Sequence, residues 1–219
     1  MQARFRNRVE AGQLLAARLK RFIGRRGLLV LGLPRGGVPV ATEVARALGA
    51  PLDVFIVRKL GVPGHPELAM GAIASGGIQV LNTEVIEMLG IGRESIVAVA
   101  AAEAVELERR EREYRGSRPT PDFHGATVIL VDDGVATGST MRAAVEALRR
   151  LKPTAIVVAA PVMSRQAKAM LARAADACEC VSTPEPFLGV GVWYEDFTQV
   201  SDQEVTGLLD GEAAHAPHA

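Results

Sequence analysis

The sequence has few aromatic residues, only two cysteines and no net charge, and each shortage narrows the class of protein that it encodes. Aromatic residues make up 4% of the 219 residues, whereas 48% are hydrophobic. The core must therefore consist of Val, Leu, Ile and Ala, which is typical of a parallel sheet covered by helices. The 25 basic residues balance the 25 acidic residues, so no overall field attracts nucleic acid or an anionic membrane.

Cysteine and long apolar runs are also scarce. Two cysteines cannot form a disulfide framework, which fits a reducing compartment, and we interpret Cys178 and Cys180 as small buried hydrophobic residues on one side of a strand. No apolar run is long enough to span a bilayer, and no signal-peptide stretch follows the basic residues 1–8. We therefore expect a cytoplasmic protein that binds neither a membrane nor a nucleic acid.

Short apolar runs alternate with segments of helical spacing, which indicates βαβ units in one α/β domain. The expected strands cover residues 28–33, 52–57, 127–131, 155–160 and 177–181, and the expected helices cover residues 8–22, 38–48, 93–114, 139–151 and 164–174, with Ser201 capping a last short helix. We predict a parallel sheet of about five strands flanked by helices, in a single domain over residues 1–210, with a disordered tail over residues 211–219.

Three segments of the expected domain need separate interpretation. Residues 69–74 and 78–81 flank a Gly-Gly pair and predict a hairpin. Residues 60–66, rich in Gly and Pro, predict a flexible loop. The second half of the long helix, residues 106–115, is almost wholly charged. We interpret it as a solvated surface with ion pairs between residues four apart, and a dimer contact is the alternative.

The clearest chemical signal is Val-Ile-Leu-Val-Asp-Asp-Gly-Val-Ala-Thr-Gly-Ser-Thr at residues 128–140, where a buried strand ends in two acids and a turn of small residues opens a helix. Gly134 and Gly138 allow the backbone to turn tightly and to approach a ligand. The free amides at the start of the helix, together with three hydroxyls, suit a phosphate dianion. The hydroxyls belong to Thr137, Ser139 and Thr140.

Asp132 and Asp133 stand directly before this turn. Ionised carboxylates accept hydrogen bonds from a ribose diol, stabilise positive charge on a ribose ring, or hold a hydrated Mg²⁺. The simpler alternative is a stretch that only caps a helix, with Ser139 as the N-cap. Two adjacent acids followed by a Thr-Gly-Ser-Thr run favour the ligand site.

These thirteen residues resemble the phosphoribosyl pyrophosphate signature of type I phosphoribosyltransferases, which is a hydrophobic strand, two acids, a small turn and Thr-Gly-x-Thr. In that family the acids contact the ribose hydroxyls and the loop holds the 5′-phosphate. The resemblance implies ribose contacts for Asp132 and Asp133, which would also hold Mg²⁺, directly or through water. It implies substrate contacts for Gly134, Val135, Ala136, Thr137, Gly138, Ser139 and Thr140. Hypoxanthine-guanine enzymes have an acid in the place of Ala136, whereas adenine-type enzymes match this chain better.

The segment Leu-Pro-Arg-Gly-Gly at residues 33–37 is similar to a second loop of that family. It follows a strand and opens a helix, so Gly36 and Gly37 can turn amides toward pyrophosphate while Arg35 adds a forked positive charge. A turn with an exposed arginine is the alternative. The family's pyrophosphate loop lies at this place, often with a strained or cis peptide.

Arg58 and Lys59 precede residues 60–66, which resemble the family's mobile loop. In that family the loop closes over the reacting centre and excludes water. Both basic residues are candidates to contact pyrophosphate. His65 lies in the same loop, and we interpret it as exposed rather than catalytic.

Residues 184–198 hold four of the nine aromatic residues, namely Phe187, Trp193, Tyr194 and Phe197. The segment resembles the hood of purine-type members, in which an aromatic ring stacks on the base. Phe187, Trp193 and Tyr194 are the candidates for stacking, and completion of a core is the alternative. The resemblance implies a small hood built from both chain ends.

The resemblance implies Mg²⁺-dependent displacement of pyrophosphate from C1 of phosphoribosyl pyrophosphate by a nitrogen nucleophile, with a purine-like nucleobase as the acceptor. Catalysis would depend on positioning and charge complementarity, and the catalytic residues would be Asp132, Asp133, Arg35 and Lys59. Members of the family commonly dimerise, which allows a homodimer.

Three other classes of protein share part of this sequence pattern. Some proteins of this fold are non-catalytic regulators that sense phosphoribosyl pyrophosphate or nucleotides, but those that bind nucleic acid need a basic face or a helix-turn-helix module, and the sequence offers neither. A receiver domain also has paired acids at a strand end, but the Ala-Thr-Gly-Ser-Thr and Arg-Gly-Gly loops do not belong to that design. A nicotinamide-binding fold is disfavoured, because no Gly-x-Gly-x-x-Gly follows a strand.

Overall fold

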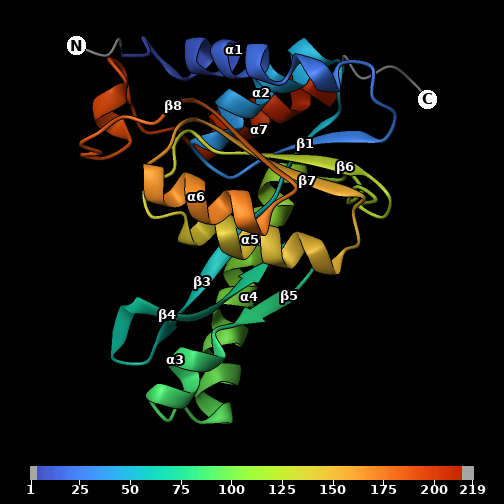
Figure 1. Cartoon of the computed structure of the whole chain (residues 1–219). Helices are drawn as coiled ribbons and strands as arrows, with labels where there is room; N and C mark the ends of the chain where they lie inside the picture. Colours follow the sequence, from blue (N-terminus) through green and yellow to red (C-terminus); the bar gives the residue numbers. More distant parts are fainter. Residues whose placement is uncertain (1–3, 214–219) are drawn as a thin grey trace.

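The computed structural model describes residues 4–213, and its main body is a five-stranded parallel sheet (Figure 1). The strand order is β2-β1-β6-β7-β8. The strands are β1 (Leu28–Gly32), β2 (Leu52–Val54), β6 (Thr127–Val131), β7 (Ala155–Val162) and β8 (Ala177–Ser182). The predicted parallel sheet is therefore confirmed. Because β1 and β6 are neighbours, the loops that follow them meet at one edge of the sheet.

Helices cover both faces of this sheet (Figure 1). One layer holds α1 (Arg8–Arg18), α2 (Gly37–Leu48) and α7 (Asp202–Ala213), the opposite layer holds α5 (Ser139–Arg150) and α6 (Arg165–Ala174), and η1 (Lys20–Phe22) and η2 (Gly191–Trp193) are short 3-10 turns. Successive strand residues face opposite layers, so Val30 packs with α1 and α2 while Leu31 packs with α5. None of the helices in the described range has the length and apolar character of a membrane span.

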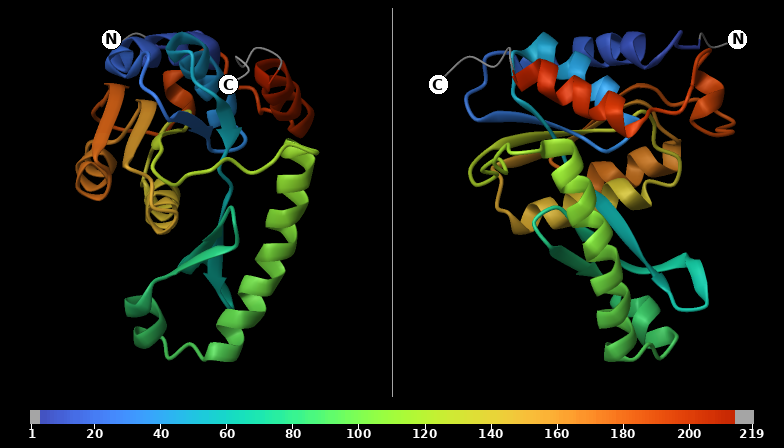
Figure 2. Two further views of the ribbon diagram at one scale, coloured as in Figure 1. Left: turned by 90° about the vertical axis from the view of Figure 1, so that its right-hand side faces the viewer. Right: turned by 180° about the vertical axis from the view of Figure 1, so that it is seen from behind.

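A second body, which we term the appendage, projects away from the main sheet (Figure 2). It consists of a three-stranded antiparallel sheet and two helices. Its elements are β3 (Val57–Val62), β4 (His65–Ala74), β5 (Ile78–Leu81), α3 (Thr83–Met88) and α4 (Arg93–Arg115). The predicted hairpin of residues 69–74 and 78–81 is confirmed as β4 and β5.

The prediction of a flexible loop over residues 60–66 is wrong. Most of this segment belongs to β3 and β4, which pair antiparallel across a tight turn, with Gly64 at a φ of +80°. The pairing register shifts on either side of Gly61. The glycines and prolines of this segment therefore belong to a bulge and a turn of a twisted two-stranded ribbon. The prediction of one strand over residues 52–57 is also wrong. The chain leaves the main sheet after Val54, at the end of β2, and β3 of the appendage begins at Val57.

The long helix α4 joins the appendage to the main body at its C-terminal end (Figure 2). Arg115 is 6% exposed, its Nε lies 3.1 Å from Asp53 Oδ2, and its Nη2 donates to the Val54 carbonyl at 3.0 Å. Next to it, the Tyr114 hydroxyl donates a short hydrogen bond to Asp202. These buried polar contacts fix the end of α4 to β2 and to the start of α7.

The charged second half of α4 forms ion pairs within the helix, as predicted. Arg109 pairs with Glu106 and with Glu113, each at 2.7 Å, and Arg110 also pairs with Glu106. Hydrogen bonds from both arginines lower the pKa of Glu106 to about 2. The charges therefore satisfy one another along the helix surface.

The N-terminal segment and the aromatic C-terminal stretch pair with each other in the hood, as predicted. The Phe5 amide donates to the Trp193 carbonyl at 2.9 Å, and the Glu195 amide donates to the Phe5 carbonyl at 2.8 Å. Ser201 Oγ accepts from the Glu204 amide at 3.1 Å and caps α7 as expected. Helix α7 continues to Ala213, so the first three residues of the predicted disordered tail are helical, while residues 214–219 lie outside the described residues.

Cys178 and Cys180 pack against one hydrophobic cluster from strand β8, as predicted. Burial, with a smaller effect of Cys180, raises the pKa of the Cys178 thiol to about 11 from its ordinary value of 9.0. The thiolate is the reactive form, so we expect Cys178 of the folded protein to react about 100-fold more slowly than a free thiol at pH 8. Labelling with a chromogenic disulfide, before and after unfolding in urea, measures this difference. Equal rates in both states would contradict it.

Candidate functional site

The loops that follow β1 and β6 are in direct contact at the carboxyl edge of the main sheet. A Cβ atom on Gly36 would lie 2.0 Å from Asp133 Oδ2, and one on Gly37 would lie 2.6 Å from the Val131 carbonyl oxygen. These two glycines therefore make room for the acid pair, a role that the sequence did not predict. The peptide bond between Pro34 and Arg35 is cis, as in many pyrophosphate loops of the family that this segment resembles.

The two aspartates are held in place by different partners. Asp132 Oδ1 accepts from the Asp133 amide at 2.9 Å. Asp133 Oδ2 accepts from Arg8 Nε at 2.9 Å, and its carbonyl oxygen accepts from the Tyr194 hydroxyl at 2.6 Å. Within residues 4–213, no hydrogen bond reaches the second oxygen of either carboxylate. The pair therefore presents two hydrogen-bond acceptors on adjacent residues.

Burial governs the charge of both aspartates. It raises the pKa of Asp132 well above the ordinary value, and the neighbouring charge of Asp133 raises it further. Burial also raises the pKa of Asp133, but the guanidinium of Arg8 opposes this rise. Arg8 therefore favours the ionised form of the residue that it contacts.

The turn after the acid pair leaves the start of α5 open. Gly138 is the N-cap at a φ of +79°, and no side chain caps the helix, so the alternative with Ser139 as the N-cap is wrong. Thr137 Oγ1 lies 3.3 Å from Ser139 Oγ. The first amides of α5 and two hydroxyls thus face outward together, which is the arrangement that binds a phosphate group.

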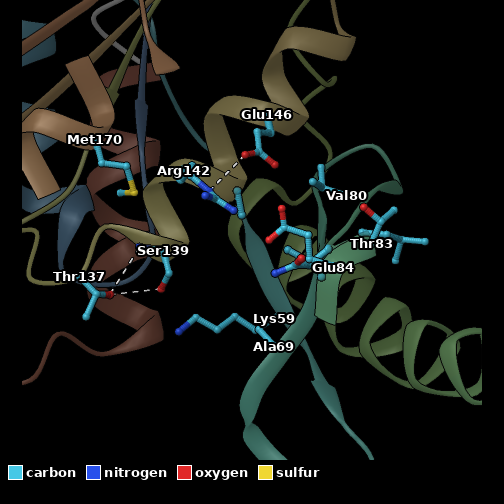
Figure 3. A pocket seen from close by; sticks show the side chains of 15 residues that line it. Lys59, Ala69, Val80, Thr83, Glu84, Thr137, Ser139, Arg142, Glu146 and Met170 are labelled. Atoms are coloured by element: carbon cyan, nitrogen blue, oxygen red, sulfur yellow. Dashed lines mark hydrogen bonds and ion pairs between the residues drawn. The ribbon is translucent and has the colours of Figure 1, made fainter. Parts of the chain in front are cut away.

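The larger cavity at the site, about 580 Å³, lies between this turn and the appendage (Figure 3). The Lys59 side chain extends from β3 toward Thr137 and Ser139 across the cavity. Arg142, one turn into α5, lines it beside Glu146, with 3.2 Å between Arg142 Nε and Glu146 Oε1. Arg142 was not among the predicted site residues. Its position three residues after Ser139 could have indicated it, because residues three apart lie on the same face of a helix.

A smaller cavity of about 280 Å³ lies beside Asp133, and Asp132 is not among the residues that line it. Its lining residues are Arg8, Arg35, Gly36, Asp133, Phe197, Gln199 and Val200. Arg35 and Lys59, grouped together by the sequence analysis, therefore line different cavities. Arg35 Nη1 lies 3.8 Å from Asp202 Oδ2.

Comparison with known proteins adds an independent finding. Residues 6–194 match the family described as the phosphoribosyl transferase domain. The chain belongs to this family. Two curated Mycobacterium tuberculosis proteins, from strains CDC 1551 and H37Rv and each named "Putative phosphoribosyl transferase", are 45% identical to it over 206 residues. The match covers 94% of this chain and 46% of theirs, so the chain spans about half the length of these relatives.

Solved structures support the same family. The protein TT1426 from Thermus thermophilus is 44% identical, with a TM-score of 0.85, over 94% of this chain and 97% of that one. A purine phosphoribosyltransferase from Pyrococcus horikoshii is 17% identical, with a TM-score of 0.50, over 92% and 99% of the two chains, which shows a likeness of fold alone. The predicted phosphoribosyl transferase fold is confirmed.

Several residues expected to contact ligand in this phosphoribosyl transferase domain lie elsewhere. Arg58 pairs with Glu103 of α4, with Nη2 at 2.6 Å from Oε2. Phe187 and Trp193 pack in the hood with Phe5, and Tyr194 is 3% exposed. These three aromatics pack together in one hydrophobic cluster, and none of them lines either cavity. His65 is exposed, as predicted.

The aromatic ring that lines the smaller cavity is Phe197, which was not a candidate. It is 37% exposed, and the Arg8 guanidinium lies 4.1 Å from its ring centroid. Its ring also packs on Gly191, where a Cβ atom would lie 2.9 Å from Phe197 Cδ1. Only the contacts made in the folded hood distinguish Phe197 from the other three aromatics.

The buried Asp132 gives a pH-dependent prediction for stability. Its pKa is raised in the folded state, so the folded protein binds this proton more tightly than the unfolded chain does. This contribution to stability is complete below the ordinary carboxyl pKa of about 4 and is lost as pH rises through the folded-state pKa. We therefore expect Asp132→Asn to unfold at a higher urea concentration than the parent protein at pH 8 and at a similar one at pH 4. If Asp132→Asn were more stable than the parent protein by the same amount at both pH values, burial of an ionised Asp132 would not be the cause.

Proposed function

We propose that this chain is an Mg²⁺-dependent phosphoribosyltransferase that moves the phosphoribosyl group of phosphoribosyl pyrophosphate to a nitrogen of a purine-like nucleobase and releases pyrophosphate. The observation that carries the proposal is the acid pair. In the described part of the chain, Asp132 and Asp133 each keep one carboxylate oxygen without a hydrogen-bond partner. Two such acceptors suit the two donors of a ribose diol, and the uncapped start of α5 suits the phosphate of the same sugar.

The residues of the site would act through positioning and charge. Asp132 and Asp133 orient the ribose and stabilise the positive charge that develops on its ring as the bond from C1 to pyrophosphate breaks. Thr137 and Ser139 hold the 5′-phosphate, and Lys59 faces them across the larger cavity, where it balances phosphate charge. Arg35 and the amides of the glycines after it hold the leaving pyrophosphate.

The donor set fits a hydrated magnesium ion. Mg²⁺ in such sites is held by one or two carboxylates, substrate phosphates and water. Asp132 and Asp133 offer the carboxylates, and residues 4–213 contain no group of three or more His, Cys, Asp or Glu side chains that could hold an ion without substrate. When bound, the ion would neutralise charge on pyrophosphate.

Two features support a purine-like acceptor. Phe197 lines the smaller cavity beside Asp133 and offers an aromatic ring near the ribose site. Ala136 occupies the place where oxopurine enzymes have an acid, so a base that needs no such partner fits the site better.

A panel of purine and pyrimidine bases, incubated with phosphoribosyl pyrophosphate and Mg²⁺ and scored by pyrophosphate release, tests the function. We expect release with at least one purine-type base, and loss of release after chelation of the metal. Binding of phosphoribosyl pyrophosphate without release in the presence of any base would instead identify the non-catalytic sensor described above.

A further inference from the structure

Arg8, at the start of α1, contacts the acid pair although the proposed reaction assigns it no role. We infer that Arg8 is a positioning residue of the ribose site, which holds the Asp133 carboxylate in the orientation that leaves one oxygen of each aspartate free for the diol. The inference rests on the proposed function, because it takes the ribose as the ligand of the two acids. It adds a residue from outside both glycine-rich loops.

Contacts with three residues fix the Arg8 guanidinium. Its Nε and Nη2 both lie 2.9 Å from Asp133 Oδ2, and its Nη1 donates to the Thr198 carbonyl at 2.8 Å. Its plane lies over Phe197, at 4.1 Å from the ring centroid. The side chain is 11% exposed. An arginine with this many partners has one conformation, so it can define the conformation of the carboxylate that it contacts.

The opposite side of the carboxylate is closed by the pyrophosphate loop. Asp133 Oδ2 lies so close to Gly36 that even a methyl group there would overlap it. Arg8 and Gly36 therefore enclose the same oxygen from two directions. Asp133 Oδ1 is the oxygen that remains for a ligand, and it acts beside Asp132 Oδ2, because Asp132 Oδ1 accepts from the backbone.

Four charged or titratable side chains surround Asp133. The groups that face it are Asp132 in the same loop, Tyr194 in the hood, Arg8 in α1 and, across the smaller cavity, Arg35. Asp132 is a like charge and Tyr194 is neutral, with a pKa raised by burial. Arg8 is the cation in contact with Asp133, and its Nε and Nη2 both hold Oδ2, so its removal would free the carboxylate to rotate.

A positioning role predicts dependence on both the diol and Asp133. The probes are ribose 5-phosphate and 2,3-dideoxyribose 5-phosphate, and isothermal titration calorimetry on the full chain measures their affinities. We expect Arg8→Gln to weaken ribose 5-phosphate binding about tenfold or more and to leave binding of the dideoxy compound nearly unchanged. In an Asp133→Asn background, Arg8→Gln should add little further loss, because the interaction it removes is already gone.

A conservative variant provides a second measurement. Arg8→Lys keeps the charge but not the fork that places Nε and Nη2 on one oxygen of Asp133, so it should restore the preference for ribose 5-phosphate over the dideoxy compound only in part. The matched control is Arg6→Ala, two residues away, whose exposed side chain pairs with Glu10 at 2.8 Å and which should bind as the parent protein does. Thermal unfolding of each variant identifies any loss of fold.

Each outcome decides a separate point. Equal losses for both sugar phosphates, or the same loss in the Asp133→Asn background, would show that Arg8 acts on the fold or the phosphate loop and would overturn the inference. If the parent protein binds ribose 5-phosphate and discriminates by the diol but releases no pyrophosphate with any base, the proposed function fails and the inference stands. If it does not bind ribose 5-phosphate at all, both fail.

Discussion

Replacing Asp132 and Asp133 together by asparagine is expected to lower the rate of pyrophosphate release by at least about 100-fold. Asparagine has nearly the same shape and still accepts a hydrogen bond through its amide oxygen, but it carries no charge. The developing positive charge on the ribose ring would therefore lose its stabilising partner, and Mg²⁺ would lose two carboxylate ligands. Steady-state measurement of pyrophosphate release with the base identified by the panel tests this prediction.

The control for the acid pair is Asp122→Asn, the same change in an exposed loop residue whose carboxylate accepts from the His124 amide. This variant should retain the parent rate. Thermal unfolding of the double variant should show a cooperative transition, which separates loss of chemistry from loss of fold. Unchanged turnover in the double variant would rule out the roles assigned to both aspartates.

Replacing Arg115 by alanine is expected to lower the free energy of unfolding by about 3–5 kcal/mol. The side chain is 6% exposed and pairs with Asp53, which is itself buried within β2. Burial already raises the pKa of Asp53, and Arg115 opposes this rise. Without Arg115, the carboxylate would be buried with only the weaker influence of Arg118, and the Val54 carbonyl would lose a donor. Urea titration followed by circular dichroism measures the loss.

Two further variants separate the ion pair from helix propensity. Arg112→Ala changes an exposed residue one turn earlier in α4 and should have little effect on stability. Combining Arg115→Met with Asp53→Asn removes both charges, so the combined loss should be smaller than the sum of the losses of the two single variants. Strict additivity would show that the two side chains do not depend on each other.

The main sheet could be predicted closely from the sequence because local and global signals agree there. Residues 127–131 are five consecutive apolar or β-branched residues, and β6 has these bounds. The helix after them begins at Ser139, as predicted, because Gly138 supplies the left-handed conformation at its start. The central strands β1 and β6 have helices on both sides and are buried at every position, so they appear in the sequence as continuous apolar runs.

The appendage shows where such prediction fails. Glycine and proline in residues 60–66 suggested a loop, but the same residues form a bulged ribbon in which β3 pairs with β4. The bulge is a property of the pairing between β3 and β4, and neither strand shows it alone.

The candidate site also contains some residues that the sequence indicates and others that it does not. The acids and the turn that we propose to bind phosphate are contiguous in sequence and can be proposed from it, whereas Arg8 lies 125 positions from Asp133 and Phe197 is one of several aromatics in its segment. No local pattern identifies such partners, because the folded hood brings them together. A homodimer and a cytoplasmic location stay predictions, and light scattering of the purified protein tests the first.

The joining of the chain ends in the hood has a consequence for synthesis. The carbonyl of Thr198 that holds Arg8 is contributed by a residue 190 positions later. A ribosome therefore releases α1 and both glycine-rich loops before Thr198, one of the partners of Arg8, is made. The nascent chain can build its central sheet first, but the surroundings of the two aspartates are complete only after residue 198 has been added, so shorter nascent chains hold the acid pair without its final geometry.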